Sequence, residues 1–129
     1  MDFLASEQIL FYTGEKYSSI YEHFNSEYNI KYSKLFLVCA CIGFKNNILE
    51  EVVGKGKEFR STYLKTEDRA NLYTIIINDQ ELGRKVALFN NKEYMNNCKK
   101  KIEKYAAGGM SVLISEVFGT NWNGYNLDK

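Results

Sequence analysis

The 129-residue sequence contains no proline, a single histidine and a single tryptophan, and almost no net charge, +1 at pH 7. The absence of proline argues against Pro-rich linkers and predicts helices joined by turns that contain glycine and asparagine. The near-zero net charge removes the global basic signature of a nucleic-acid-binding protein, although it leaves room for a local basic patch. A chain of this length is expected to form one domain with a core that needs no disulfides.

The cysteine content and the length of the apolar runs also argue against a disulfide-stabilised secreted protein and against a membrane protein. Three cysteines do not make a disulfide framework, and the start of the chain, Met1 to Leu4, lacks the basic and apolar regions of a signal peptide. The longest apolar run, residues 35–44, is shorter than the roughly 20 residues that a bilayer requires. We therefore expect a protein of the reducing cytoplasm that does not enter a membrane.

That apolar run, Leu-Phe-Leu-Val-Cys-Ala-Cys-Ile-Gly-Phe at 35–44, organises the rest of the chain. Because it is apolar on every side, it predicts a helix surrounded by the other elements, beginning at Ser33 as its cap. A buried parallel strand is the alternative, but the Cys-Ala-Cys centre lacks the β-branched residues typical of strands. Two neighbouring helical stripes support the helix: Leu35, Val38, Cys39 and Ile42 on one, and Phe36, Ala40 and Gly43 on the other.

Three further helices follow from spacing and capping. Residues 15–25 carry apolar side chains at helical intervals, and Thr66 followed by Glu67 and Asp68 predicts the start of a helix that ends near residue 78. Residues 91–118 form one continuous helical stripe that passes through Gly108 and Gly109 without losing phase. Each glycine costs about 1 kcal/mol relative to alanine, which is tolerable where another helix must approach closely.

The remaining segments are less regular. Residues 9–12 fit an edge strand or a packed loop, residues 80–90 fit a weak helix, and residues 52–59 fit a small hairpin around Gly54-Lys55-Gly56. Together these patterns predict a mainly α fold, a compact helical domain around the central apolar helix with at most a small β-hairpin. The domain is expected to cover residues 1–118, and residues 119–129 to form a loose tail.

The residues that could carry catalysis favour structural roles instead. Cys39, Cys41 and Cys98 occupy apolar helix positions, which favours core packing over nucleophilic chemistry. The thiols and His23 show no zinc-ligand spacing, and the Gly-Lys-Gly-Lys run lacks the spacing of a phosphate-binding loop. The paired acids 50–51 and 79/81 come without the matching lysine on a strand that a nuclease would need. We expect no catalytic, cofactor or metal site.

Lysines crowd the last helix and give the best functional candidate. Acidic neighbours partly offset them, so a solvated helix face is one interpretation; phosphate contact, with a steep salt dependence, is the other. The tail adds aromatic rings of the kind enriched at protein interfaces. We therefore predict that residues 92–125 bind a protein partner, or a second copy of the chain, through Lys99, Lys100, Lys104, Trp122 and Tyr125.

Three segments together resemble one small family. These are the Ala-Cys-Ile-Gly-Phe-Lys core at 40–45, the Thr-Glu-Asp-Arg helix start at 66–69, and Lys-Tyr-Ala-Ala-Gly-Gly-Met at 104–110. In this order, over residues 17–118, the chain is similar to the DNA phosphorothioation (dnd) system-associated protein 4 family. That resemblance implies a bacterial role in defence against foreign DNA and carries no established catalytic activity. The heavy use of tyrosine and asparagine and the longer tail depart from the family, which leaves the particular defence system open.

Three functional hypotheses follow. The first, which we favour, is a non-catalytic accessory subunit of a DNA-modification or restriction system, bound to other protein subunits. The second is a nucleic-acid-binding module that uses the lysine-rich helix. The third, a small nuclease, has the least support in the sequence.

Overall fold

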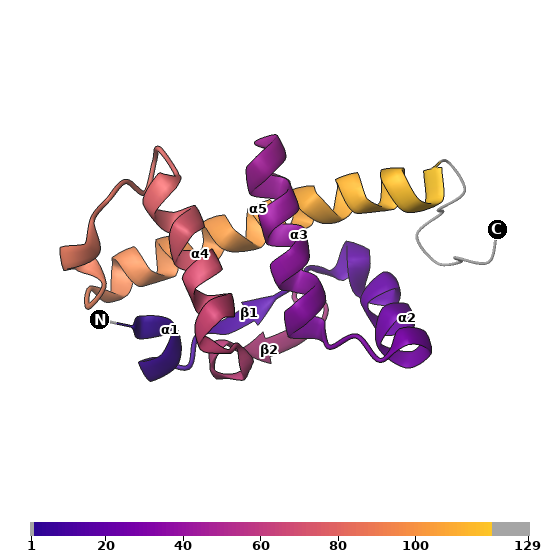
Figure 1. The fold of residues 1–129 in the computed structure, drawn as a ribbon, viewed down its shortest axis with the longest axis horizontal. Coiled ribbons are helices and arrows are strands. Elements are labelled where there is room, and N and C mark those ends of the chain that lie inside the picture. Colours follow the sequence, from indigo (N-terminus) through magenta and orange to yellow (C-terminus); the bar gives the residue numbers. More distant parts are fainter. Residues whose placement is uncertain (1, 120–129) are drawn as a thin grey trace.

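The computed structural model describes residues 2–119 of the chain. Helices dominate, and they lie across one another beside a small two-stranded sheet (Figure 1). The predicted mainly α fold with only a small β element is confirmed. In chain order the elements are α1 (Phe3–Ser6), β1 (Leu10–Tyr12), η1 (Glu15–Tyr17), α2 (Ser18–Tyr28), α3 (Tyr32–Asn46), β2 (Glu58–Arg60), η2 (Ser61–Tyr63), α4 (Thr66–Asn78), η3 (Val86–Leu88) and α5 (Lys92–Phe118).

The apolar run forms α3, the central helix, as predicted. It buries Leu35, Phe36, Leu37, Cys39, Ala40 and Gly43 and crosses the middle of α5 (Figure 1). Two predicted caps are wrong by one or two positions. Lys31 is the N-cap of α3 and Lys65 that of α4, so Ser33 and Thr66 lie inside the first turns. Each helix begins directly after a lysine in an extended conformation, which the preference for hydroxyl caps does not anticipate.

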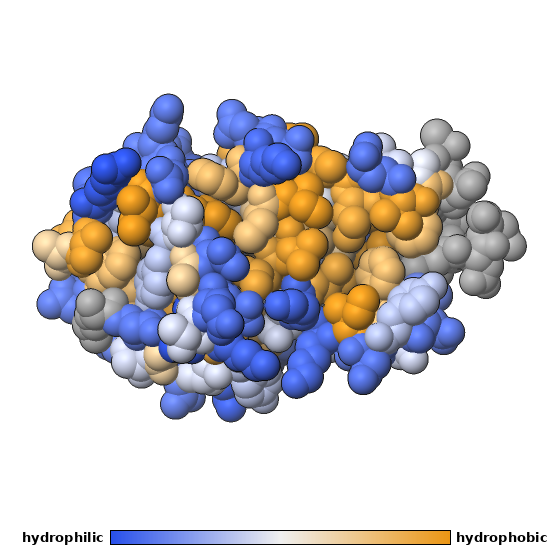
Figure 2. Space-filling model, in the orientation of Figure 1, coloured by the Kyte–Doolittle hydropathy of each residue, from blue (hydrophilic) through white to orange (hydrophobic). Residues whose placement is uncertain are grey.

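One side of α3 is open, which corrects the expectation of burial on every side. Val38 is 43% exposed, Cys41 and Ile42 are half-buried, and Lys34 and Lys45 are exposed. These five residues recur at intervals of three or four and therefore share one face, which we name the outer face of α3. Figure 2 shows apolar side chains gathered over α3 and over the C-terminal half of α5.

Two glycine contacts fix the crossing of α3 and α5. A Cβ atom on Gly109 would lie 1.7 Å from the carbonyl oxygen of Cys39, and one on Gly43 would lie 1.9 Å from that of Tyr105. A Cβ atom on Gly108 would lie 2.2 Å from the carbonyl oxygen of Ile48. No side chain fits at these positions, so the predicted close helix approach at the glycine pair is confirmed. The 27-residue α5 runs through it without interruption.

The small sheet pairs distant segments. Strands β1 and β2 are antiparallel, with Phe11 opposite Phe59. The hairpin predicted around Gly54–Gly56 is wrong, because β2 pairs with the N-terminal strand and not with the residues just before the turn. A ring cluster explains the choice: Phe36 of α3 lies 5.2 Å from Phe11 and 5.0 Å from Phe59, between ring centroids.

Residues 80–90 form turns and the short η3 in place of a regular helix. Leu82 and Phe89 are buried, whereas Val86 is 51% exposed, so these three residues do not share a buried face. Gly83 adopts a left-handed conformation with φ of 70°, which interrupts a helix at this point. None of the described helices is long and apolar enough to cross a membrane.

The close contact at Gly109 predicts that adding a single methyl group there destabilises the fold. Gly109→Ala should lower the free energy of unfolding by about 1–3 kcal/mol through overpacking, although alanine is intrinsically the better helix former by about 1 kcal/mol. Urea denaturation measures the change. Ser115→Ala, at an exposed position of the same helix, is the control and should change stability by less than about 0.5 kcal/mol. A Gly109→Ala protein as stable as the parent would contradict the close crossing.

Candidate functional site

Lys99, the first of the three lysines predicted to bind a partner, is held within the domain. Its Nζ lies 2.9 Å from Oε2 of Glu103 and 4.9 Å from the centroid of the Tyr12 ring, and its side chain is 16% exposed. Glu103 is itself buried and also accepts the backbone N–H of Tyr12 at 2.8 Å. The Lys99–Glu103 pair therefore joins β1 to α5, and Lys99 is poorly placed to bind a partner.

The other lysines of α5 differ in how they are used. Lys104 lies 3.3 Å from Glu51, while Lys101 pairs with Glu81 and lies 3.9 Å from Asp79. Lys100 is exposed and forms no ion pair with any residue in the range 2–119. The structure therefore does not bring Lys99, Lys100 and Lys104 together as an open cationic row. Trp122 and Tyr125 lie outside the described residues.

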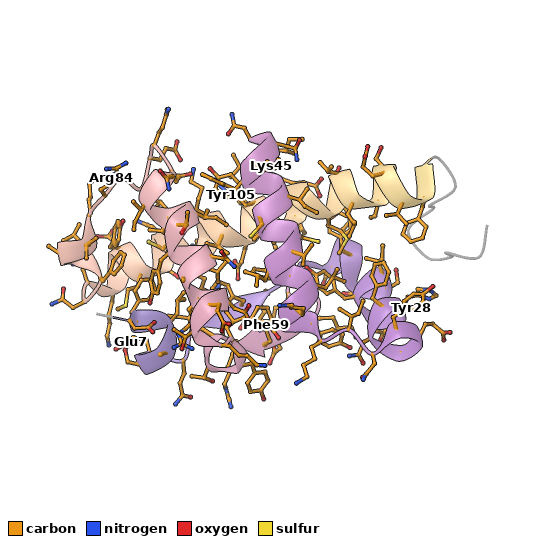
Figure 3. The ribbon with its side chains drawn as sticks, in the orientation of Figure 1. Glu7, Tyr28, Lys45, Phe59, Arg84 and Tyr105 are labelled. Atoms are coloured by element: carbon orange, nitrogen blue, oxygen red, sulfur yellow. The ribbon has the colours of Figure 1, made fainter. Side chains whose placement is uncertain are left out.

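A buried carboxylate beside these lysines, that of Asp79, is hydrogen-bonded within the fold. Oδ2 of Asp79 accepts a hydrogen bond from the Tyr105 hydroxyl at 2.5 Å, and Oδ1 accepts the backbone N–H groups of Glu81 and Leu82 at 3.0 and 2.9 Å. Asp79 and Tyr105 line a hollow of about 420 Å³ between the ends of α3 and α4 and the middle of α5. Figure 3 shows Tyr105 of α5 close to the end of α3 that carries Lys45. Asp79 thus closes the turn after α4 and joins it to Tyr105 of α5.

Burial, with the hydrogen bond to Asp79, raises the pKa of Tyr105 above its ordinary value of 10.0. The unfolded chain therefore releases this proton at a lower pH than the folded protein, so stability should fall as the pH rises above 10. Tyr105→Phe should flatten this alkaline loss while lowering stability at pH 7. Urea midpoints measured from pH 7 to 11 test both effects. Equal alkaline slopes in parent and variant would show that Tyr105 does not contribute.

The cysteines occupy packed positions, with one of them partly open. Cys39 and Cys98 are fully buried, and burial raises the pKa of Cys39 to about 12 and that of Cys98 to about 11. Cys41, on the outer face of α3, is half-buried and its pKa is also raised by burial. Among the described residues no group of three or more His, Cys, Asp or Glu side chains is arranged to hold a metal ion.

These positions predict an order of thiol reactivity. At pH 8 all three thiols should label slowly with a maleimide, because little thiolate forms when the pKa is raised. Cys41 should react first, and Cys39 and Cys98 should react only as the protein unfolds. Mass spectrometry of peptides from a labelling time course gives the order. Labelling of Cys39 before Cys41 in native protein would be inconsistent with this packing.

The outer face of α3 is the surface that the sequence analysis missed. Val38 is exposed at the centre of this face. Val117 of α5 is also exposed, at 57%, and Figure 2 shows apolar side chains over the C-terminal half of α5. A signal was present in the sequence: Lys34 and Lys45 share a helical face with Val38 and Ile42, and lysines at such positions face solvent. The length of the apolar run concealed this stripe.

No family model, curated protein or solved structure matches the chain. The resemblance to the DNA phosphorothioation system-associated family stays a prediction.

Proposed function

We propose that the protein is a non-catalytic accessory subunit of a bacterial DNA-modification or restriction system, and that it binds another protein subunit through the outer face of α3. The observation that carries this proposal is the exposed apolar centre of that face. A single exposed valine is ordinary on a protein surface. Val38, however, adjoins the half-buried Cys41 and Ile42 on a helix whose opposite side forms the core.

The charges at the ends of this face indicate the chemistry of the partner. Lys34 lies at one end, with its side chain 61% exposed and its Nζ 3.5 Å from Asp68; Lys45 lies exposed at the other end. Protein interfaces combine an apolar centre with a polar rim. The partner surface that complements this face is therefore apolar at its centre and carries carboxylates at its edges.

Two further considerations support a protein partner over DNA. The resemblance to a family encoded beside DNA sulfur-modification and restriction genes supplies the setting of defence against foreign DNA. The lysines of α5 support DNA binding less well, because a phosphate would have to displace Glu103 from Lys99 and Glu51 from Lys104. Lys92 and Lys100, the α5 lysines without an ion pair among the described residues, are a weak basis for a phosphate contact.

A charge placed on the outer face should weaken the interaction. Val38→Asp should weaken binding to the partner at least about tenfold, because a carboxylate would have to be desolvated at the centre of the interface. Val86→Asp, at a similarly exposed valine of η3, is the matched control and should bind like the parent. Co-purification with tagged products of the neighbouring genes identifies the partner, and calorimetry measures the affinity. Circular dichroism checks that both variants fold.

Two further variants separate this proposal from its alternatives. Trp122→Ala with Tyr125→Ala tests residues 92–125 as the main contact, and reversal of Lys99, Lys100 and Lys104 to Glu tests DNA binding. If Val38→Asp binds the partner normally while the tail variant does not, the contact lies in residues 92–125 and the outer face is excluded. If Val38→Asp instead dissociates a dimer of the chain itself, the face is a homodimer interface and the proposal fails.

A further inference from the structure

Strand β2 lies at the border of the small sheet, and its outer edge is open. The sheet has two strands, so β2 pairs with β1 along one edge, and no element of the described chain pairs with the other. Figure 1 shows β2 near the lower border of the molecule with β1 above it, so this second edge faces away from α5. An open strand edge presents backbone groups that a further strand can join. We name the open side of Glu58–Arg60 the β2 edge.

The register of the two strands shows which backbone groups lie on this edge. The N–H of Ser61 bonds to the carbonyl oxygen of Ile9 at 2.7 Å, and that of Thr13 bonds to the carbonyl oxygen of Lys57 at 2.9 Å. In an antiparallel pair, hydrogen-bonded positions alternate with positions whose backbone groups point away from the neighbouring strand. Lys57 and Ser61 are bonded toward the N-terminal strand, and so is the residue midway between them.

Glu58 and Arg60 occupy the intervening positions, so their backbone groups point away from β1. Arg60 is also the N-cap of η2, and its carbonyl oxygen accepts the first hydrogen bond of that turn. The N–H of Arg60 and both backbone groups of Glu58 are therefore left for another strand. One donor and one acceptor two residues apart are what an antiparallel neighbour needs.

The side chains of the β2 edge carry opposite charges. Glu58 and Arg60 are both exposed, whereas Phe59 between them is buried. Neither charged side chain forms an ion pair with another residue in the range 2–119. Lysines protect many edge strands, because like charges repel a second copy of the same edge. Glu58 and Arg60 have opposite signs, so a second copy that runs antiparallel is attracted instead.

We propose that the protein forms a homodimer in which two β2 edges pair antiparallel into a continuous four-stranded sheet. The two-fold axis passes between the two Phe59 residues, which places Glu58 of each subunit opposite Arg60 of the other. The Arg60 N–H of each subunit donates to the Glu58 carbonyl oxygen across the interface, and two carboxylate–guanidinium pairs lie on the exposed face of the sheet. A two-fold interface requires a patch that is complementary to itself. Glu-Phe-Arg meets that requirement in this register.

A hollow of about 430 Å³ beside the β2 edge provides room for the second strand. Glu58 and Phe59 line it, and so do Lys31 and Tyr32 at the start of α3. Tyr63 stands in the same wall and is 69% exposed. Aromatic residues of this kind are enriched at protein interfaces. The second subunit therefore meets an exposed ring next to the paired strands.

The association state of the full chain tests the dimer directly. Pairing over three residues makes a small interface, and interfaces below about 1,200 Å² are typical of weak, reversible complexes. Sedimentation equilibrium between about 10 μM and 1 mM, the range of such affinities, should therefore show a monomer that converts to a dimer as the concentration rises. A monomer throughout this range would overturn the proposal.

Charge reversal tests the register. Glu58→Arg and Arg60→Glu each place like charges opposite one another at both pairs, so each should weaken the dimer at least about fivefold. An equimolar mixture of the two variants restores opposite charges at both pairs and should associate like the parent. The matched controls are Glu116→Arg and Arg84→Glu, at exposed positions outside the sheet, and both should dimerise normally. Circular dichroism checks that every variant folds.

Two results of this experiment would contradict the proposal. Reversal variants that dimerise like the parent would place the interface elsewhere, and a mixture that stays monomeric would exclude the two-fold register. Val38→Asp should dimerise normally, because the outer face of α3 is a different surface. Loss of partner binding in Val38→Asp and loss of the dimer in Glu58→Arg are therefore separate outcomes, and either proposal can fail without the other.

Discussion

The contact of α3 with α5 at Gly43 and Gly109 is the constraint on which the rest of the structure depends. Backbone atoms of each helix occupy the space where the other would carry a Cβ atom, so the axes come closer than ordinary side chains allow. Buried small residues lie close to these glycines in sequence, with Cys39 and Ala40 on α3 and Ala106 on α5. The cost of glycine in two helices is accepted because this crossing fixes the position and the angle of the central helix.

Several polar contacts then attach the remaining elements to α5. Glu103 accepts the backbone N–H of Tyr12 and so holds β1, and Tyr105 donates to Asp79 and so holds the turn after α4. The carbonyl oxygen of Lys104 accepts the N–H of Glu50, which in turn accepts the Tyr17 hydroxyl at 2.6 Å. Because Glu103 is buried, Lys99 is needed to neutralise it; an unpaired buried carboxylate is far more costly than a paired one. The lysine-rich helix therefore uses much of its charge inside the molecule.

Local sequence patterns were sufficient for the long helices α2, α3, α4 and α5 and for the glycine crossing. The stripe through Gly109 and the length of the apolar run at 35–44 are properties of neighbouring residues, and a single reading of the chain reveals them. The pairing of Phe11 with Phe59 depends on Phe36, a residue of a third element, so local turn signals selected the wrong partner for β2. The ion pairs of the lysines could not be predicted for the same reason, because Glu51, the partner of Lys104, lies far from it in the sequence. The start of α3 was mispredicted because hydroxyl residues are the preferred caps: Ser33 was expected to cap the helix, which instead begins after Lys31.

Because α3 is held rigidly, it can carry features that the usual preferences for helix caps and for polar surface residues disfavour. Its first turn lacks a side-chain cap, and Val38 exposes an apolar surface. Each feature lowers stability slightly, and a helix stabilised only by its intrinsic helix propensity would not be expected to retain such features. α3 tolerates them because the glycine crossing and its buried face hold it independently. Departures of this kind are expected at functional sites, and here they lie on two separate parts of one fixed helix. A partner that binds this helix meets groups whose positions are already set, and little conformational entropy is lost on binding.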